Sequence, residues 1–263
     1  MIMSLNFRRS LLAAAALAAV MLFPCRMRAQ APGKPQRVMV PAPSWQAGAY
    51  WAQTDHQLLT DFANLARFHA EDLKLGPAKP GEKRVVFMGD SITQAWNLTR
   101  SFPGKPYINR GISGQTTPQM LIRFRQDVIQ LQPKVVLILA GTNDLAGNTG
   151  PMTLPQTENN LESMAQLAQA NHIAVVLCSV LPATHYWWHP QVPNPAHKIV
   201  MLNRWMRAYA KRHGYVYVDY YSAMKNAAGG LPKRLSKDGV HPLPAGYAIM
   251  ARLAEAGIKK AMK

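Results

Sequence analysis

The sequence predicts an α/β protein: a three-layer α/β/α sandwich around a parallel sheet of roughly five strands, in a doubly wound, flavodoxin-like arrangement. Strand-like runs alternate with helical patterns along most of the chain, which is the signature of such a sheet. Three of those runs, VVFM, KVVLILA and IAVVLCSV, are continuously apolar. Parallel strands covered by helices on both faces have this pattern. The length of 263 residues suits a single domain with a substantial core.

The expected elements follow one another closely. A segment from residue 54 has Leu58, Phe62, Leu65, Phe68 and Leu73 at helical spacing and stops at Gly76-Pro77. Strands are expected at residues 84–88, 107–109, 134–140, 173–180 and 215–219. Helices are expected at about 117–131, 155–171, 195–213 and 244–262. Because ligands bind beyond the carboxyl ends of such strands, the residues just past each strand are the candidates for function.

The N-terminus has the features of a secretory signal peptide. Arg8 and Arg9 precede a 13-residue apolar run at 11–23, which is shorter than the roughly 20 residues that span a membrane. We therefore expect 1–30 to be a cleaved signal peptide, 31–53 a linker or extended arm, and 54–263 the domain. The mature protein would be secreted or periplasmic in a bacterium. The alternatives are an uncleaved membrane anchor or a lipoprotein attached through Cys25.

The composition restricts the classes of partner and cofactor. The formal charge is +17, and removal of four arginines with the signal peptide would leave about +13. This charge suits an anionic envelope surface, but no nucleic-acid-binding motif is present and no nucleic-acid partner is expected. The remaining cysteine, Cys178, lies in an apolar strand and is predicted to be a buried packing residue. No metal, nucleotide or dinucleotide motif occurs, so no cofactor is expected.

Polar clusters lie just past the expected strands and before the last helix. They are Gly89-Asp90-Ser91, the segment NRGISGQ that contains Gly111, the segment GTND that contains Asn143, and the segment DGVH that contains Asp238 and His241. An open parallel sheet is expected to gather these four clusters at one edge. Because the first strand ends at Gly89, Ser91 is expected to lie at this edge, at the start of the next helix.

Ser91, His241 and Asp238 fit the roles of nucleophile, base and orienting acid. A serine hydroxyl needs an adjacent base, and an imidazole accepts and returns a proton near neutral pH. Asp238 lies three residues before His241, within reach of its Nδ1–H. The competing histidines His185, His189 and His197 have no acid at this spacing before a terminal helix. Taken alone, Ser91 could equally be an ordinary helix N-cap.

The four blocks GDSIT, NRGISG, GTND and DGVH, in this order, resemble those of the SGNH, or GDSL, hydrolase family. The resemblance extends over about residues 54–260. The alternative G-x-S-x-G elbow of other hydrolases is absent, because Thr93 stands where that motif has glycine. The resemblance implies a carboxylic ester hydrolase that works through an acyl-enzyme. It also implies an oxyanion hole made of the Ser91 N–H, the Gly111 N–H and the Asn143 side-chain amide.

The substrate is expected to be a small-molecule or carbohydrate ester. Within the family the chain looks closest to small acylhydrolases that resemble platelet-activating-factor acetylhydrolase and favour short acyl groups. The first expectation is a secreted acetylesterase acting on a decorated carbohydrate. The alternatives are a lysophospholipase or thioesterase acting on envelope lipids, and an inactive binding protein on the same fold. No pair of glycosidase carboxylates emerges, and the oligomeric state is not predicted.

Four aromatic residues are candidates for contact with the substrate. Tyr186, Trp187 and Trp188 lie in the proline-rich loop 182–197, where they could stack on a sugar or shield an acyl group. Alternatively, they cover the helix that follows. Trp96, just past the start of the serine helix, could line the pocket or belong to the core.

Overall fold

The computed structural model describes residues 49–263, with side chains from residue 55 onward. The expected signal peptide and most of the expected arm, residues 1–48, lie outside the described residues. The described part contains a five-stranded sheet in the order β2-β1-β3-β4-β5, with every neighbouring pair parallel. The strands are β1 (Val85–Gly89), β2 (Tyr107–Gly111), β3 (Val135–Leu139), β4 (Ala174–Cys178) and β5 (Val216–Val218). This is the flavodoxin strand order, and the predicted fold class is confirmed.

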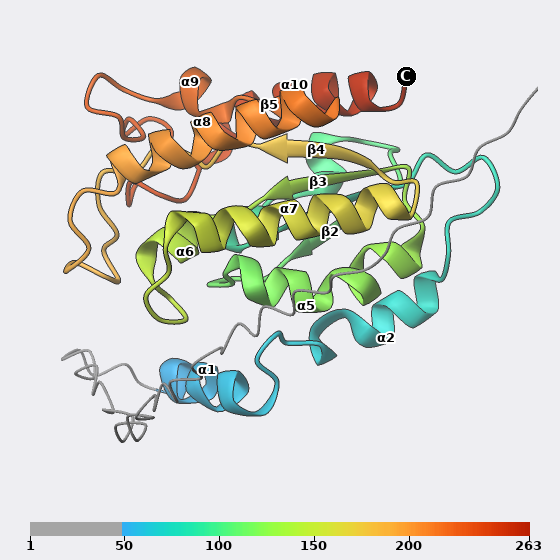
Figure 1. Ribbon diagram of the computed structural model, residues 1–263, viewed down its shortest axis with the longest axis horizontal. Coiled ribbons are helices and arrows are strands. Elements are labelled where there is room, and N and C mark those ends of the chain that lie inside the picture. The colour runs from blue at the N-terminus through green and yellow to red at the C-terminus, as the bar shows by residue number, and fades with distance from the viewer. Residues whose placement is uncertain (1–48) are drawn as a thin grey trace, which may run out of the picture. The chain divides into compact units, whose positions relative to one another are not determined.

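Helices fill the connections between the strands (Figure 1). They are α1 (Ala49–Thr60), α2 (Ala66–Leu75), α3 (Ser91–Gln94), α4 (Leu98–Ser101), α5 (Thr117–Asp127), α6 (Thr142–Ala146), α7 (Leu154–Ala170), α8 (Ala196–His213), α9 (Tyr220–Met224) and α10 (Pro244–Ala261), with a 3₁₀ turn at Ile129–Leu131. None of the helices in residues 49–263 is both long and apolar enough to cross a membrane.

The first helical segment differs from its prediction in two ways. Helix α1 begins at Ala49, inside the segment 31–53 that the sequence suggested to be a linker or extended arm. The expected continuous helix is also broken between α1 and α2. Asp61 accepts the backbone N–H groups of Leu65 and Ala66 at 2.8 and 3.0 Å, and Asn64 has a left-handed φ of 55°. These local interactions end one helix and cap the next, although the apolar spacing runs through the break.

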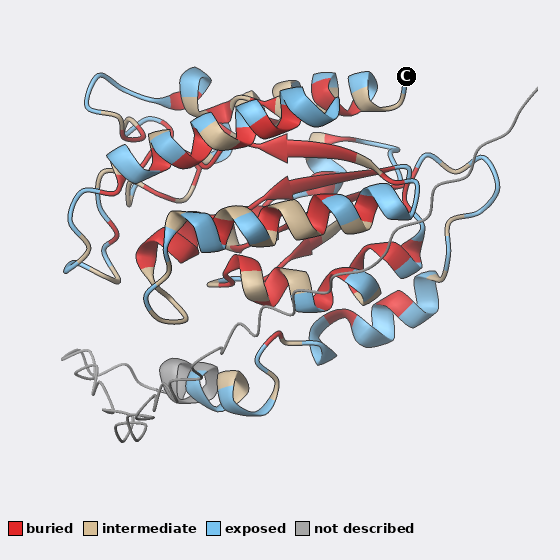
Figure 2. Ribbon diagram, viewed as in Figure 1, coloured by how far each residue is buried: buried red, intermediate tan, exposed pale blue. Residues whose placement is uncertain are grey.

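The sheet is buried on both faces, as its apolar strands predicted (Figure 2). On one face Val86 and Val136 join a core with α5, α7 and α8, the helices drawn in front of the sheet in Figure 1. On the other face Phe87 and Leu137 join a second core with α3, α9 and α10. Alternate side chains of one strand therefore supply both cores. Cys178 belongs to the second core, and its burial confirms the predicted packing role.

The register brings the ends of the first three strands together. In the sheet Gly89, the last residue of β1, is paired with Gly111 of β2 and with Leu139 of β3. The three loops that leave these strands therefore start side by side at the carboxyl edge. These loops carry Ser91, the NRGISGQ segment and Asn143.

Candidate active site

Ser91 is the first residue of α3, two residues beyond the end of β1. Asp90 forms the N-cap of α3 by accepting the Ile92 N–H at 2.9 Å. The tight connection requires glycine at 89, because a Cβ there would lie 2.8 Å from the Leu139 carbonyl oxygen. The Ser91 N–H has no hydrogen-bond partner among the described residues. Both the hydroxyl and the N–H of Ser91 are therefore available at the edge of the sheet.

The structure brings Ser91, His241 and Asp238 into one hydrogen-bonded chain. Ser91 Oγ lies 2.9 Å from His241 Nε2, and His241 Nδ1 lies 2.6 Å from Asp238 Oδ2. A hydroxyl bonded to an imidazole that is in turn oriented by a carboxylate is the arrangement that activates a serine nucleophile. The two partners of Ser91 come from a single turn just before α10.

This turn holds the Asp238 carboxylate firmly. Asp238 Oδ1 accepts the backbone N–H groups of Val240 and His241 at 3.0 and 2.8 Å and the Ser236 hydroxyl at 3.0 Å. Partial burial by itself raises the pKa of Asp238. The hydrogen bonds from His241 and Val240 outweigh that effect and hold the pKa well below its ordinary value. Asp238 therefore stays ionised beside the imidazole. Sequence reasoning did not single out Ser236.

Tyr247 joins the helix that follows His241 to the helix that carries Ser91. Its hydroxyl, from the first turn of α10, donates to the Ile92 carbonyl oxygen of α3 at 2.8 Å. The Ser91–His241 separation therefore depends on a bond between segments 155 residues apart. No sequence pattern indicates this partner.

Asn143 lies on α6, beside both other loops. Its Nδ2 donates to the Gln115 carbonyl oxygen at 2.9 Å and lies 3.5 Å from Asp90 Oδ2, a separation at the limit for a hydrogen bond. One amide hydrogen is thus fixed by Gln115, while the other has only this weak contact. The buried Asn143 amide therefore lies between the residue before Ser91 and the NRGISGQ segment.

The structure does not favour Gly111 as an oxyanion donor. Its N–H already donates to the Asn109 side chain at 2.9 Å. A Cβ at Gly111 would lie 2.2 Å from the Gln94 nitrogen, so this glycine is needed for the close packing of β2 against α3. The Asn109 amide also donates to the Thr93 and Trp96 carbonyl oxygens at the end of α3.

Gly114, three residues further on, has the free N–H that Gly111 lacks. No hydrogen-bond partner for it occurs among the described residues, and its φ is +78°. A Cβ there would have Asn148 Nδ2, at 3.8 Å, as its nearest neighbour. The NRGISGQ segment contains both glycines, and the sequence alone gave no reason to prefer the second.

Substitution of the two glycines is expected to have different effects on stability. Gly111→Ala forces a methyl group against the backbone of α3 and should lower the free energy of unfolding by about 3 kcal/mol. Gly114→Ala makes only an ordinary van der Waals contact with Asn148 and should cost only about 1 kcal/mol for its left-handed backbone. Urea unfolding of both variants measures the difference. Equal losses would contradict the distinct roles assigned to the two glycines.

Two of the four aromatic candidates are core residues. Trp96 is only 2% exposed, packs edge-on against Phe87 at 5.5 Å and donates to the Ser101 hydroxyl. It therefore does not line a pocket. Tyr186 is also buried.

The other two aromatic candidates lie at the surface near the turn that holds Asp238 and His241. Trp188 is half-buried, and its ring centroid lies 6.3 Å from that of His241. Trp187 is 56% exposed and packs edge-on against Trp188. The buried Tyr186 ring packs against Trp188, with ring centroids 5.1 Å apart.

Two buried carboxyl groups brace the site. Burial raises the pKa of Asp90 and of Asp144 to about 6. Asp144 accepts the backbone N–H and the hydroxyl of Thr117, and so ties α6 to the start of α5. Asp90 thus caps α3, and Asp144 holds the loop after β3 against α5.

Arg123 is a buried cation that sequence reasoning missed. It donates to the Gly89 carbonyl oxygen at 3.1 Å and to the Gln115 side chain at 2.6 Å, and it pairs with Asp127 at 2.8 Å. It therefore links the strand before Ser91 to the residue that fixes Asn143. Helical periodicity cannot reveal a charged residue pointing into the core.

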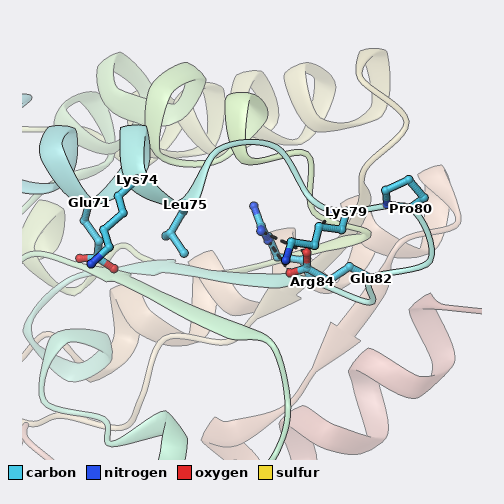
Figure 3. A pocket seen from close by; sticks show the side chains of 7 residues that line it. All are labelled: Glu71, Lys74, Leu75, Lys79, Pro80, Glu82 and Arg84. Atoms are coloured by element: carbon cyan, nitrogen blue, oxygen red, sulfur yellow. Dashed lines mark hydrogen bonds and ion pairs between the residues drawn. The ribbon is translucent and has the colours of Figure 1, made fainter.

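A surface pocket at the other edge of the sheet is separate from these residues (Figure 3). It is lined by Glu71, Lys74, Leu75, Lys79, Pro80, Glu82 and Arg84. Arg84 immediately precedes β1, whereas Ser91 follows its carboxyl end. Arg84 and Glu82 form a salt bridge within this pocket.

Comparison with known proteins agrees with the geometry. Residues 87–249 match the model of the GDSL-like Lipase/Acylhydrolase family. The chain is similar to a GDSL-like lipase of known structure from Bacteroides thetaiotaomicron, with 46% identity, coverage of 76% of this chain and 100% of that chain, and a TM-score of 0.74.

Two relatives with curated names are esterases. Esterase TesA of Pseudomonas aeruginosa is 28% identical over 60% of this chain and 79% of its own length. An acetylxylan esterase of Geobacillus stearothermophilus is 25% identical over 65% of this chain and 91% of its own length. The chain therefore belongs to the GDSL-like lipase/acylhydrolase family that its four sequence blocks predicted, and it is a carboxylic ester hydrolase.

Proposed function

We propose that this protein is an esterase that removes short acyl groups, acetyl above all, from carbohydrate esters, with Ser91, His241 and Asp238 as its catalytic triad. The observation that carries the proposal is the unbroken hydrogen-bonded chain from the Asp238 carboxylate through the His241 ring to the Ser91 hydroxyl. These hydrogen bonds lie at the carboxyl edge of the sheet, where ligands bind in folds of this class.

Each side chain has a defined chemical task in this mechanism. His241 Nε2 takes the Ser91 proton as Oγ attacks the ester carbonyl carbon, and it then returns the proton to the leaving alcohol oxygen. A water molecule, deprotonated by the same nitrogen, hydrolyses the resulting acyl-enzyme and restores Ser91. Asp238 remains ionised throughout, because it fixes the His241 tautomer and stabilises the imidazolium ion.

The oxyanion is held in this proposal by the N–H groups of Ser91 and Gly114 and by the Asn143 amide. Two features support Gly114 in place of Gly111: its N–H has no partner among the described residues, and the Gly111 N–H is already bonded. The position of Asn143 also supports this set of three donors. Its amide contacts Asp90, which precedes Ser91, and Gln115, which follows Gly114. Donors held in place before the reaction stabilise the developing charge without reorganisation.

Asn143→Ala should separate transition-state stabilisation from substrate binding. The variant is expected to lower kcat by about 10²–10³-fold while KM changes little, since the donor acts on charge that forms during the reaction. Steady-state kinetics on one activated acetate ester measures both constants. A rise in KM with kcat unchanged would make Asn143 a ground-state binder instead.

The preference for short acyl groups is tested by a series of p-nitrophenyl esters from acetate to palmitate. Similarity to a protein named acetylxylan esterase supports a small acyl group, and the exposed ring of Trp187 and the half-buried ring of Trp188 suit a sugar. We expect kcat/KM to be highest for acetate or butyrate and to vanish in Ser91→Ala. A preference for long chains would assign the enzyme to lipid substrates.

We further propose that the enzyme is exported, because Arg8 and Arg9 precede the short apolar run at 11–23. N-terminal sequencing of the mature protein, after expression of the full chain in a bacterium and cell fractionation, tests this proposal. Protein that retains Met1 in the cytoplasmic fraction would refute it.

A further inference from the structure

Asn148 joins three parts of the site. It follows α6, and its backbone N–H donates to the Asn143 carbonyl oxygen at 3.0 Å. Its side-chain amide donates to the Gly114 carbonyl oxygen at 2.9 Å, and its Oδ1 accepts the indole Nε1–H of Trp188 at 2.9 Å. A single side chain thus connects an aromatic residue at the site to the loop that carries Gly114.

The loop around Trp188 also packs on the catalytic turn. A Cβ at Gly239, between Asp238 and His241, would lie 2.9 Å from Cε1 of His185. His185 therefore covers one part of this turn, while the Trp188 ring lies 6.3 Å from the His241 ring. Trp188 thus lies near the His241 ring, is tied through Asn148 to the Gly114 loop, and packs against the ring of Tyr186.

The chemistry of ester cleavage indicates which half of the substrate lies near His241. The leaving alcohol oxygen receives its proton from His241 Nε2, so it must come within hydrogen-bond distance of that nitrogen. The alcohol half therefore extends from the His241 side of the scissile bond. The acyl half extends from the other side of the carbonyl carbon.

We propose that the Trp188 ring, fixed by Asn148, is the subsite for the alcohol half of the ester, and that this half is a pyranose ring. This inference rests on the proposed function. A flat, half-buried indole whose N–H is already bonded to the protein presents an apolar face, which suits the C–H face of a sugar. Asn148 is a positioning residue in this account: it touches no substrate and acts through Trp188 and the Gly114 loop.

The test varies the two halves of the substrate separately in the full-length protein. Xylopyranose tetra-acetate and ethyl acetate share the acyl group, whereas ethyl acetate and ethyl butyrate share the alcohol. For Trp188→Ala we expect the ratio of kcat/KM for the sugar acetate to that for ethyl acetate to fall about 10-fold. The ratio for ethyl butyrate to ethyl acetate should not change. A change in the butyrate ratio alone, or in neither ratio, would overturn the proposal.

A second set of variants tests the role of Asn148 and does not depend on whether Trp188→Ala folds. Trp188→Phe keeps a ring but loses the indole donor, and Asn148→Ala removes the acceptor. Each should lower the sugar ratio about 3- to 5-fold, and the double variant should lower it no further. The Asn148 bond to the Gly114 loop acts on both acetates and cancels in the ratio, so the Trp188–Asn148 bond is the one interaction that both changes break. Additive losses would overturn the role assigned to Asn148.

The controls distinguish this inference from the proposed function. Trp205→Phe alters a half-buried tryptophan that stacks on Tyr209 of α8, and it should leave the sugar ratio unchanged. If Ser91→Ala still hydrolyses ethyl acetate, the proposed function fails. If hydrolysis depends on Ser91 but the sugar ratio is the same in every Trp188 variant, only the subsite fails.

Discussion

Ser91→Ala is expected to lower kcat by about 10⁴- to 10⁶-fold on every ester, because the variant has no nucleophile to form an acyl-enzyme. The fold should be unaffected. Asp90 rather than Ser91 caps α3, and within residues 49–263 the one side-chain bond of Ser91 is that to His241. Initial rates on p-nitrophenyl acetate, together with thermal unfolding, measure both expectations.

The matched control for this substitution is Ser163→Ala on α7. The Ser163 hydroxyl donates to the Asn159 carbonyl oxygen within the same helix and has no contact with the site. This variant should keep the activity of the original protein. If Ser91→Ala also kept its activity within 10-fold, Ser91 would not be the nucleophile, since a lost nucleophile costs far more than that.

Asp238→Asn is expected to lower kcat by about 10³- to 10⁴-fold with little change in KM. The Asp238 carboxylate accepts from His241 Nδ1 with one oxygen and from two backbone N–H groups and the Ser236 hydroxyl with the other. An amide has only one accepting oxygen, so it must either give up those bonds or present its NH₂ group to the imidazole. The second arrangement places the imidazole proton on Nε2, where it blocks proton transfer from Ser91.

The lowered pKa of Asp238 adds a prediction about stability. Its pKa in the folded protein lies below the ordinary value of 3.8, so the ionised carboxylate stabilises the fold above about pH 4. This contribution is lost as the pH falls through the folded-state pKa. The difference in free energy of unfolding between the original protein and Asp238→Asn should therefore be larger at pH 7 than at pH 3. Asp219→Asn removes the charge of the residue that caps α9, whose side-chain partners are Ser222 and Arg207 and not the triad, and is the control for activity.

The fold was predictable because a strand buried on both faces has a continuously apolar sequence. Residues 85–89 and 135–139 are apolar at every position except a terminal glycine, and both strands are fully buried. The break between α1 and α2 was not predictable from apolar spacing. It depends on local bonds from Asp61 that compete with helix continuation.

The candidate site was predictable where residue type and spacing carry the chemistry. An acid three residues before a histidine can reach it within one turn, and Asp238 and His241 do so. Gly111 and Gly114 could not be distinguished in this way. The difference between them lies in which N–H is bonded, and that depends on Asn109 and on the packing of α3.

For some residues, contacts with distant segments determine whether they belong to the core or to the site, and no nearby sequence pattern indicates this. Trp96 follows Ser91 by only five residues, yet it is a core residue because it packs against Phe87 and Tyr247. Arg123 and Tyr247 each reach the site through a bond to a backbone carbonyl group of a distant segment, and Arg123 has a further bond to the Gln115 side chain. Every residue has a backbone carbonyl oxygen, so the accepting residue can be of any type. The sequence therefore does not indicate which residue accepts such a bond.

Covalent labelling of the nucleophile tests the central claim most directly. The protein is treated with a fluorophosphonate, which reacts with an activated serine hydroxyl, and the adduct is located by mass spectrometry of the intact protein and its peptides. We expect one adduct per chain, on Ser91, with activity lost in proportion to labelling and no adduct in Ser91→Ala. Hydrolysis that continues at full rate when Ser91 is fully labelled, or inactivation with the adduct on another residue, would contradict the account.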